Sequence, residues 1–234
     1  MSQGTIALVV VVCIVIAGYG FWVVRRMILQ RNELEAFAGA HGWSYQLQAL
    51  GLVRQLGGEP FENGTNATAT HLMQGSFRGV LARVYQFSYD KATFMPLSGN
   101  NPARVGEDDF AYSIATVLLP GDRFPYPVPM VQVKPEGVRT RLRAALGRGD
   151  VQLGMPAFDE RFHVATDDPR AAQYFLTAQL QQWMLTDPRF AECPFRIAGD
   201  EIITWWPGML DTERITPMLE LCADIVAQLP GAAR

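Results

Sequence analysis

An uninterrupted apolar run opens the chain and contrasts with everything that follows it. Between Thr5 and Val24, 17 of 20 residues are hydrophobic, and no residue up to Val24 is charged. Twenty helical residues span about 30 Å, the thickness of the hydrocarbon core of a bilayer. In lipid, a helix satisfies every backbone polar group of such a segment, whereas an isolated strand does not. The pattern therefore predicts a transmembrane helix over 5–24 that follows a short N-terminus, 1–4.

A cleaved signal peptide is the alternative interpretation of this run. Signal peptides begin with positive charge and end on small residues at the cleavage site. Here no side-chain charge precedes the run, and Tyr19, Phe21 and Trp22 stand where small residues are needed. Aromatic rings suit the membrane interface. We therefore favour an uncleaved, single-pass anchor.

The charges that flank the run predict its orientation. Arg25, Arg26 and Arg31 follow it directly, while the preceding residues carry no charged side chain. The positive-inside rule then places the C-terminal part in the cytoplasm and the N-terminus outside the cell membrane. The three cysteines show no pairing pattern, which agrees with a reducing compartment.

Helical periodicity continues beyond the apolar run. Apolar residues recur near helical spacing between Arg25 and His41, and Gly42 follows where a helix would end. We expect 25–42 to be a juxtamembrane helical stalk that continues the membrane helix and holds the following domain close to the bilayer.

Apolar and polar residues alternate with a period of two in the next part of the chain, 43–135, which is therefore predicted to be a β-rich half. Residues 43–47 are either a first short strand or an entry loop. The clearer strand segments are His71–Ser76 and Val80–Tyr89 around a tight Phe77-Arg78-Gly79 turn, Phe110–Leu119, and Val128–Lys134.

Two polar, turn-forming stretches separate these strands. Gly57–Thr70 is rich in Gly, Asn and Thr, and Lys91–Asp109 is rich in Gly, Asn, Pro and acidic residues. Both are predicted to be loops. The second is long for a loop inside a compact domain, which suggests mobility or a function.

The spacing of apolar residues changes again in residues 136–230, which we call the α+β half. Residues 231–234 are a tail. The pattern predicts a helix over Gly137–Leu146, a strand over Phe162–Ala165, a helix from Asp168-Pro169 to Leu185, a hairpin of Phe195–Ala198 and Glu201–Trp206 around Gly199-Asp200, and a last helix that ends at Leu229. Pro217 leaves the start of the last helix open, because proline belongs in a first turn.

Clustered strands joined by short turns favour an α+β fold over a doubly wound parallel sheet. We expect an antiparallel sheet packed with two or three helices, behind the transmembrane helix and stalk. All 43 charges fall on the 210 residues after Val24, an ordinary density for a folded domain, and the formal net charge is −3. This acidity disfavours a nucleic-acid partner.

Several short patterns resemble a group of uncharacterised, single-span bacterial membrane proteins of actinobacterial type. The resembling residues are Gly42-Trp43, Leu119-Pro120, Val133-Lys134-Pro135-Glu136-Gly137, Phe158-Asp159 with Phe162 and Val164, Asp167-Asp168-Pro169, and Pro207-Gly208. They extend over most of the chain after the stalk. The resemblance implies a membrane anchor followed by one soluble part. It implies no activity, cofactor or catalytic residue.

Asp159, His163, Asp167 and Asp168 form the densest polar group in the chain. A histidine among carboxylates can bind a metal or act as a general base. The simpler interpretation is that Asp159 caps a turn, Asp168 caps the following helix, and His163 lies on the surface of a strand. No spacing of His and Cys typical of a metal site and no nucleotide-binding motif occurs, so we expect no metal and no cofactor.

Two other features are candidate binding surfaces. Arg139, Arg141 and Arg143 form the basic concentration of the chain, which could contact lipid headgroups or be a solvated helix face. Trp205 and Trp206 are adjacent on a predicted strand, so their side chains should point to opposite faces. The outer tryptophan is then either covered by a helix or left for a protein partner.

These features favour a non-enzymatic, membrane-anchored cytoplasmic domain that binds a protein partner or the bilayer surface. The alternative is an enzyme of unknown class with its site near Asp159, His163 and the 91–109 loop. A deep pocket lined by carboxylates and His163 would favour the enzyme, whereas a shallow face that bears a tryptophan would favour binding.

Overall fold

A computed structural model describes residues 3–53, 60–61, 65–95, 104–121, 124, 127–136 and 151–231. In chain order, its elements are α1 (Gln3–Ala40), β1 (Ser44–Gln48), α2 (Leu50–Val53), β2 (Thr65–Phe77), β3 (Val80–Met95), β4 (Arg104–Leu118), β5 (Val128–Pro135), α3 (Pro156–Arg161), β6 (Phe162–Thr166), α4 (Pro169–Phe175), α5 (Ala178–Thr186), the 3-10 helix η2 (Pro188–Ala191), β7 (Phe195–Gly199), β8 (Glu201–Pro207) and α6 (Thr212–Gln228).

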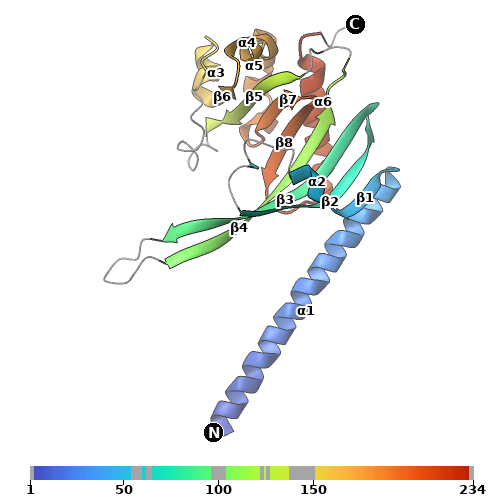
Figure 1. Ribbon diagram of the computed structural model, residues 1–234, viewed down its shortest axis with the longest axis vertical. Helices are drawn as coiled ribbons and strands as arrows, with labels where there is room; N and C mark the ends of the chain where they lie inside the picture. Colours follow the sequence, from blue (N-terminus) through green and yellow to red (C-terminus); the bar gives the residue numbers. More distant parts are fainter. Residues whose placement is uncertain are drawn as a thin grey trace.

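The strands form one eight-stranded sheet in the order β1-β2-β3-β4-β8-β7-β5-β6 (Figure 1). Every neighbouring pair is antiparallel. The sheet runs through both halves of the sequence, because β4 of the first half pairs with β8 of the second. The predicted α+β class with an antiparallel sheet is confirmed.

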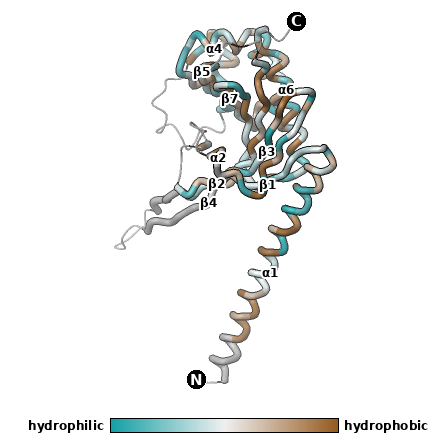
Figure 2. Tube along the Cα trace, turned by 45° about the vertical axis from the view of Figure 1, so that its right-hand side comes forward, coloured by the Kyte–Doolittle hydropathy of each residue, from teal (hydrophilic) through white to brown (hydrophobic). Residues whose placement is uncertain are grey.

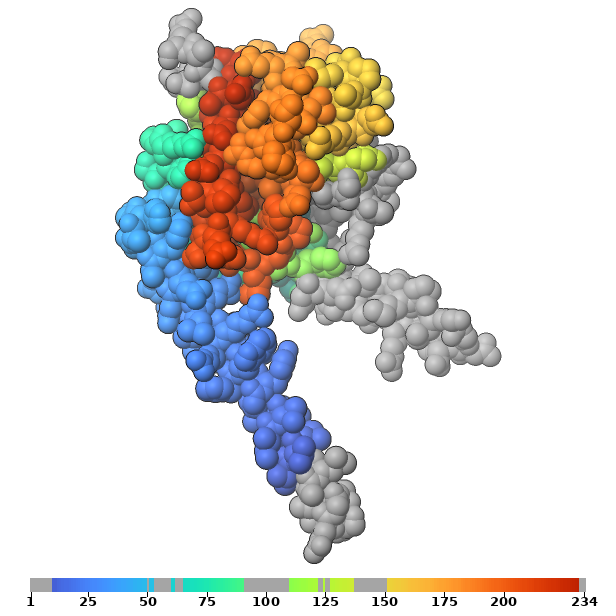
Figure 3. Space-filling view, turned by 180° about the vertical axis from the view of Figure 1, so that it is seen from behind, coloured from blue at the N-terminus to red at the C-terminus, as the bar shows by residue number. Residues whose placement is uncertain are grey.

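The sheet separates two hydrophobic clusters. The larger cluster lies between the sheet and the helices α3 to α6, and it contains Ile202 of β8 and Ile225 of α6. The smaller cluster occupies the other face, around Ile203 and Trp205 of the same strand. Strand alternation thus sends consecutive residues of β8 into different cores. Figure 3 shows α6 in red along the helical face, with α1 in blue beside its first turns.

Helix α1 joins the apolar run to the domain without a break. Its side chains from Val10 to Trp22 are all exposed, and brown, hydrophobic residues prevail there in Figure 2. Farther along, Leu34 and Ala38 are buried in the larger core. The helix is long and apolar enough to cross a membrane. The predicted helical continuation of the apolar run is confirmed as far as Ala40, and the division into a span and a stalk stays a prediction.

The stalk ends as its glycine predicts. Gly42 has a φ of +68°, its N–H donates to Gly39 O (3.1 Å), and the N–H of Trp43 donates to Ala38 O (2.8 Å). These two bonds form a Schellman motif, which satisfies carbonyls that a helix end otherwise leaves unpaired. The chain then enters β1, so the open question over residues 43–47 resolves as a strand from Ser44.

Both predicted loops of the β-rich half are shorter than expected. Strand β2 already begins at Thr65, inside the Gly57–Thr70 stretch. Strands β3 and β4 also continue into the expected 91–109 loop, with backbone pairing out to Met95 opposite Arg104. The hairpin projects from the sheet as an arm (Figure 1). The backbone hydrogen bonds of a hairpin do not require an alternation of apolar and polar side chains. The sequence of this segment contains no other pattern that predicts the two strands.

The predicted helix over 168–185 is divided in two. Asp168 caps α4 as expected, but α4 ends at Phe175, and α5 starts after a new N-cap at Thr177, whose hydroxyl accepts from Leu180 N (3.3 Å). The predicted hairpin at Gly199-Asp200 is confirmed. The predicted helix over Gly137–Leu146 lies outside the described residues.

The last helix begins earlier than its proline suggests. Asp211 caps α6 by accepting from Glu213 N (3.0 Å), so Pro217 lies inside the helix. A proline at this position removes one backbone hydrogen bond of the helix. The inward residues of α6 match the predicted stripe, including Ile215, Met218 and Cys222.

Candidate functional site: two pockets that share Arg214

Trp205 and Trp206 lie on opposite faces of the sheet, as strand alternation predicts. Trp205 is 4% exposed and packs in the smaller core. Trp206 is half-buried on the helical face, where the guanidinium of Arg214 stacks 4.8 Å from the centre of its ring. This face is therefore covered only in part by α6, and the remaining indole surface opens into a pocket.

We call this hollow the Trp206 pocket, and it has a volume of about 500 Å³. Its lining comes from η2 and the residues after it, from β8 and from the first half of α6: Pro188, Arg189, Glu192, Cys193, Trp206, Arg214, Pro217, Met218 and Leu221. Most of these side chains are apolar, and the charged ones include both signs. The pocket combines an apolar floor with charged groups, the composition typical of binding sites.

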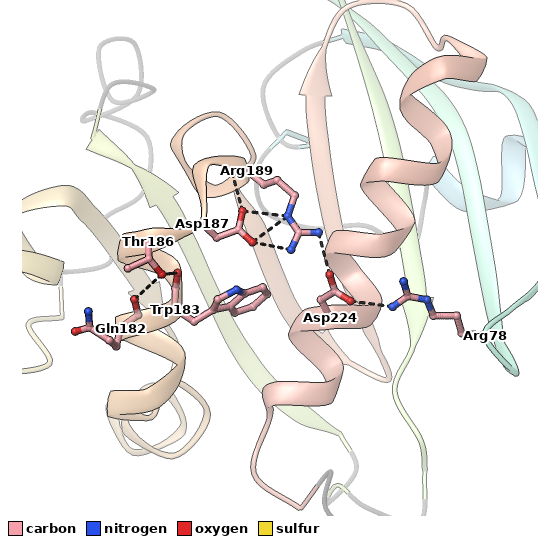
Figure 4. Close-up of polar contacts among 7 residues, drawn as sticks. All are labelled: Arg78, Gln182, Trp183, Thr186, Asp187, Arg189 and Asp224. Atoms are coloured by element: carbon pink, nitrogen blue, oxygen red, sulfur yellow. Dashed lines mark hydrogen bonds and ion pairs between the residues drawn. The ribbon is translucent and has the colours of Figure 1, made fainter.

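Arg189 is the most firmly held of the charged groups of this pocket. Its guanidinium donates to both carboxylate oxygens of Asp187 (2.6–3.1 Å) and to Asp224 of α6 (2.9 Å), as Figure 4 shows. These bonds raise the pKa of Arg189 and lower that of Asp187. Asp224 also accepts from Arg78 of the β2–β3 turn (2.8 Å). The network joins η2, α6 and the hairpin turn behind the pocket.

Cys193 lines the same pocket but is not poised to act as a nucleophile. Its side chain is almost fully buried, and burial raises the pKa of its thiol to about 12. The reactive form of cysteine is the thiolate. At neutral pH Cys193 is therefore a protonated, apolar part of the pocket wall.

A second hollow, the stalk pocket, has a volume of about 580 Å³ and lies between α1 and the β8–α6 connection. Its lining residues are Arg26, Leu29, Gln30, Glu33 and Leu34 of the stalk and Pro207, Gly208, Met209, Leu210, Asp211, Thr212 and Arg214 of the connection and α6. Arg214 lines both pockets, so the two hollows adjoin at its side chain.

Hydrogen bonds fix the two walls of the stalk pocket to each other. The side-chain amide of Gln30 donates to Leu210 O (2.9 Å) and to Gln86 Oε1 (3.4 Å). Gln86 Oε1 also accepts from Leu210 N (3.3 Å). Because Leu210 is buried, these bonds satisfy backbone groups that water does not reach. The stalk, β3 and the β8–α6 connection are thereby joined at one point.

The Asp159 and His163 candidates have defined places elsewhere. The Asp159 carboxylate accepts from Leu153 N (2.9 Å) and Gly154 N (3.0 Å), so both oxygens close a turn. His163 lies on β6 opposite Lys134, and its neighbours Phe162 and Val164 face the larger core. Alternation therefore directs His163 to the other face. Neither residue lines the two pockets.

The remaining sequence candidates fall largely outside the described part of the chain. This applies to Arg139, Arg141 and Arg143, and to the central residues of the 91–109 stretch. Asp168 has the helix-capping role that its position before Pro169 indicates. Within the described ranges, no group of three or more His, Cys, Asp or Glu side chains is arranged to hold a metal ion.

The opposite face of the sheet carries a half-buried polar pair that sequence reasoning missed. Arg83 of β3 lies 3.6 Å from Glu201 of β8, and burial raises the pKa of that carboxyl group. The buried phenol of Tyr85 is nearby, and its pKa is also raised by burial. Arg83 and Glu201 lie on strands that are distant in sequence and come together only through the order of the strands in the sheet. No local sequence pattern therefore predicts the pair.

Comparisons with known proteins bear on the fold. No protein-family model matches this sequence, and no curated protein sequence matches it. Among solved structures, the crystal structure of the mycobacterial trehalose monomycolate transport factor A is similar, with a TM-score of 0.57 and 14% sequence identity. The similarity covers 88% of this chain and 98% of that chain. The chain thus shares its α+β fold with a protein from a mycobacterium, which is an actinobacterium.

Proposed function

We propose that this protein is a non-enzymatic binding module, anchored to the cell membrane by α1, whose Trp206 pocket receives a segment of a protein partner. The observation that carries the proposal is the pocket itself, an open apolar hollow floored by an exposed part of Trp206. An open hollow that bears a tryptophan supports a binding module over an enzyme.

The chemistry of the lining supports a protein partner. Tryptophan and arginine dominate the energetics of protein interfaces, where an apolar centre is surrounded by a charged rim. Trp206, Met218 and Pro217 supply the centre here, and Arg189 and Glu192 supply opposite charges. A volume near 500 Å³ accommodates a few anchoring side chains of a partner.

Membrane attachment is supported by α1. Its exposed apolar side chains from Val10 to Trp22 would be costly in water, and the helix is long and apolar enough to cross a bilayer. The solved neighbour is named a transport factor, which agrees with a non-enzymatic role at a membrane. The partner in this proposal is therefore another component of the same membrane.

Arg25, Arg26 and Arg31 support a cytoplasmic location for the domain. A reporter fused to Arg234 tests this orientation. A fusion to green fluorescent protein should fluoresce, and a fusion to alkaline phosphatase should be inactive. An active alkaline phosphatase fusion would overturn the cytoplasmic assignment without affecting the pocket proposal.

The pocket is tested by photo-crosslinking of the full chain in its native membranes. A benzophenone side chain placed at exposed Pro217, which lines the pocket, should form an adduct of defined mass. The same group at exposed Ala227, near the end of α6 and away from the pocket, is the matched control. The adduct at 217 should disappear in Trp206→Ala. Equal adducts at both positions, or an adduct that survives Trp206→Ala in a folded variant, would contradict the proposal.

A further inference from the structure

We propose that the stalk pocket binds the headgroup of an anionic phospholipid, through its phosphodiester, from the bilayer that α1 crosses. This inference rests on the proposed membrane attachment and adds a ligand at a second, adjoining site. It is carried by the height of the pocket above the span, by two stacked arginines and by the apolar side chains beside them.

The pocket begins where a headgroup would lie. Arg26 is two residues beyond Val24, the last residue of the predicted span, which places it about 3 Å along the helix axis from the hydrocarbon edge. The headgroup layer is about 5–7 Å thick on each side of a bilayer. Gln30, at about 9 Å, marks the level at which the β8–α6 connection is bonded to the stalk. The lower end of the pocket is thus immersed in the headgroup layer.

Two arginines line this hollow, and each is stacked on a tryptophan. The Arg26 guanidinium lies 5.5 Å from the ring centre of Trp22, and that of Arg214 lies 4.8 Å from the ring centre of Trp206. Neither forms an ion pair with a carboxylate of the described residues, whereas neighbouring Arg31 is paired with Glu35. Stacking orients a guanidinium and leaves its N–H edge available for a phosphate, which it can bind through two parallel bonds.

One of the two acidic residues of the pocket is engaged by a backbone N–H, and the other lies farther from the membrane than Arg26. Asp211 is engaged as the N-cap of α6, where its carboxylate accepts from Glu213 N. Glu33 lies seven residues after Arg26, about 10 Å farther from the membrane. An anion that entered from the bilayer would therefore meet Arg26 before it approached Glu33.

Apolar side chains continue the site above Arg26, on the side away from the bilayer. Leu29 is 48% exposed and Met209 is 47% exposed, and both line the stalk pocket. A free phosphate ion would gain nothing from them, whereas the carbon atoms of a lipid headgroup beyond its phosphate would bury part of their surface. The lining thus favours a lipid over an inorganic anion, although the phosphate chemistry is shared.

Native mass spectrometry of the full chain in detergent micelles tests this assignment. Dioleoyl phosphatidylglycerol should be retained at least about tenfold more strongly than dioleoyl phosphatidylcholine of the same acyl chains. Arg26→Gln and Arg214→Gln should each weaken phosphatidylglycerol binding about tenfold, as expected for the loss of a charge-assisted bond. Arg25→Gln is the matched control, because Arg25 adjoins Arg26 in sequence but does not line the pocket.

Three results would overturn the proposal: equal retention of the two lipids, an equal effect of Arg25→Gln, or displacement of the lipid by millimolar inorganic phosphate. Thermal unfolding of each variant shows whether it remains folded. Crosslinking at Pro217 does not depend on Arg26, so an unchanged adduct in Arg26→Gln separates a failure of the lipid site from a failure of the partner pocket.

Discussion

The indole ring of Trp43 lies against the backbone of Gly75. A Cβ atom added at Gly75 would fall 2.1 Å from Cδ1 and 2.4 Å from Cγ of Trp43, and the indole Nε1 donates to Ser76 O (3.2 Å). The register of β1 and β2 places the two residues side by side. Because Trp43 follows the Schellman turn of the stalk directly, this contact fixes the direction in which α1 leaves the sheet.

Gly75→Ala should loosen the junction between stalk and sheet. The new methyl group would collide with the inner atoms of the indole, which cannot move without displacing Trp43. We expect a loss of about 1–3 kcal/mol in the free energy of unfolding, the usual range for overpacking, measured by chemical denaturation of the full chain in detergent.

Gly39→Ala is the matched control, because a Cβ atom at this helical position would meet no heavy atom within 4 Å beyond the adjacent backbone of its own helix. It should be neutral or slightly stabilising, since alanine is the better helix former. A Gly75→Ala variant as stable as Gly39→Ala would show that Trp43 does not restrain the stalk.

Asp224 is the central residue of the charge network in Figure 4. Asp224→Asn would weaken its bonds to both Arg78 and Arg189. Because the carboxylate is about one-third exposed, we expect the free energy of unfolding to fall by about 1–2 kcal/mol. Glu220→Gln is the control, since Glu220 is more exposed and lies 3.8 Å from Arg78. Its effect should stay below about 0.5 kcal/mol.

Gln86→Leu should uncouple the β8–α6 connection from the stalk. The substitution conserves approximate size but removes the acceptor for buried Leu210 N and for Gln30. An unsatisfied buried N–H costs about 1–3 kcal/mol. Amide hydrogen exchange at residues 208–211 should accelerate, while exchange in the β3–β4 ladder near Val84 should change little. Uniform acceleration throughout the sheet would instead indicate global destabilisation.

The raised pKa of Cys193 predicts both slow labelling and a pH dependence of stability. Ellman's reagent should react with Cys193 only on unfolding, because the native thiol stays protonated at neutral pH. A thiol whose folded pKa is about 12, above its unfolded value of 9.0, contributes stability that is intact below pH 9 and is lost as pH rises toward 12.

Wild type should therefore lose up to about 2 kcal/mol relative to Cys193→Ala between about pH 8 and 10.5. The variant removes only this titration, so the other buried thiol and the tyrosines cancel in the comparison. A stability difference that does not vary with pH would contradict the burial of this thiol.

The two hairpin turns were predicted correctly because the residues of each turn mark it locally. The turn at Arg78-Gly79 has positive φ at both residues, and the second is a glycine, which adopts it readily. The hairpin at Gly199-Asp200 has positive φ at Gly199. The division of the helix at Leu176 was missed because its apolar stripe is compatible with one helix or two. The break is stabilised by Thr177 and by Gln181 Nε2, which donates to Leu176 O (2.6 Å).

The candidate site was predictable only in part. Adjacent Trp205 and Trp206 on a strand have to face opposite ways, and that argument needs no tertiary information. No sequence pattern singled out Arg214. It lines both pockets because three segments meet around it only in the fold: the stalk, the β8–α6 connection and η2. Gln30 was missed for the same reason, since its partners Gln86 and Leu210 are 56 and 180 residues away.

In the proposed membrane attachment, the unbroken course of α1 fixes the rotation of the domain about the helix axis as well as its distance from the bilayer. Each residue inserted just after Val24 would lift the domain about 1.5 Å and turn it about 100° around the helix axis. A single insertion would therefore aim the Trp206 pocket at a different neighbour in the membrane, although no residue of the pocket had changed. An insertion of four residues, close to one full turn, would restore its direction while raising it by about 6 Å.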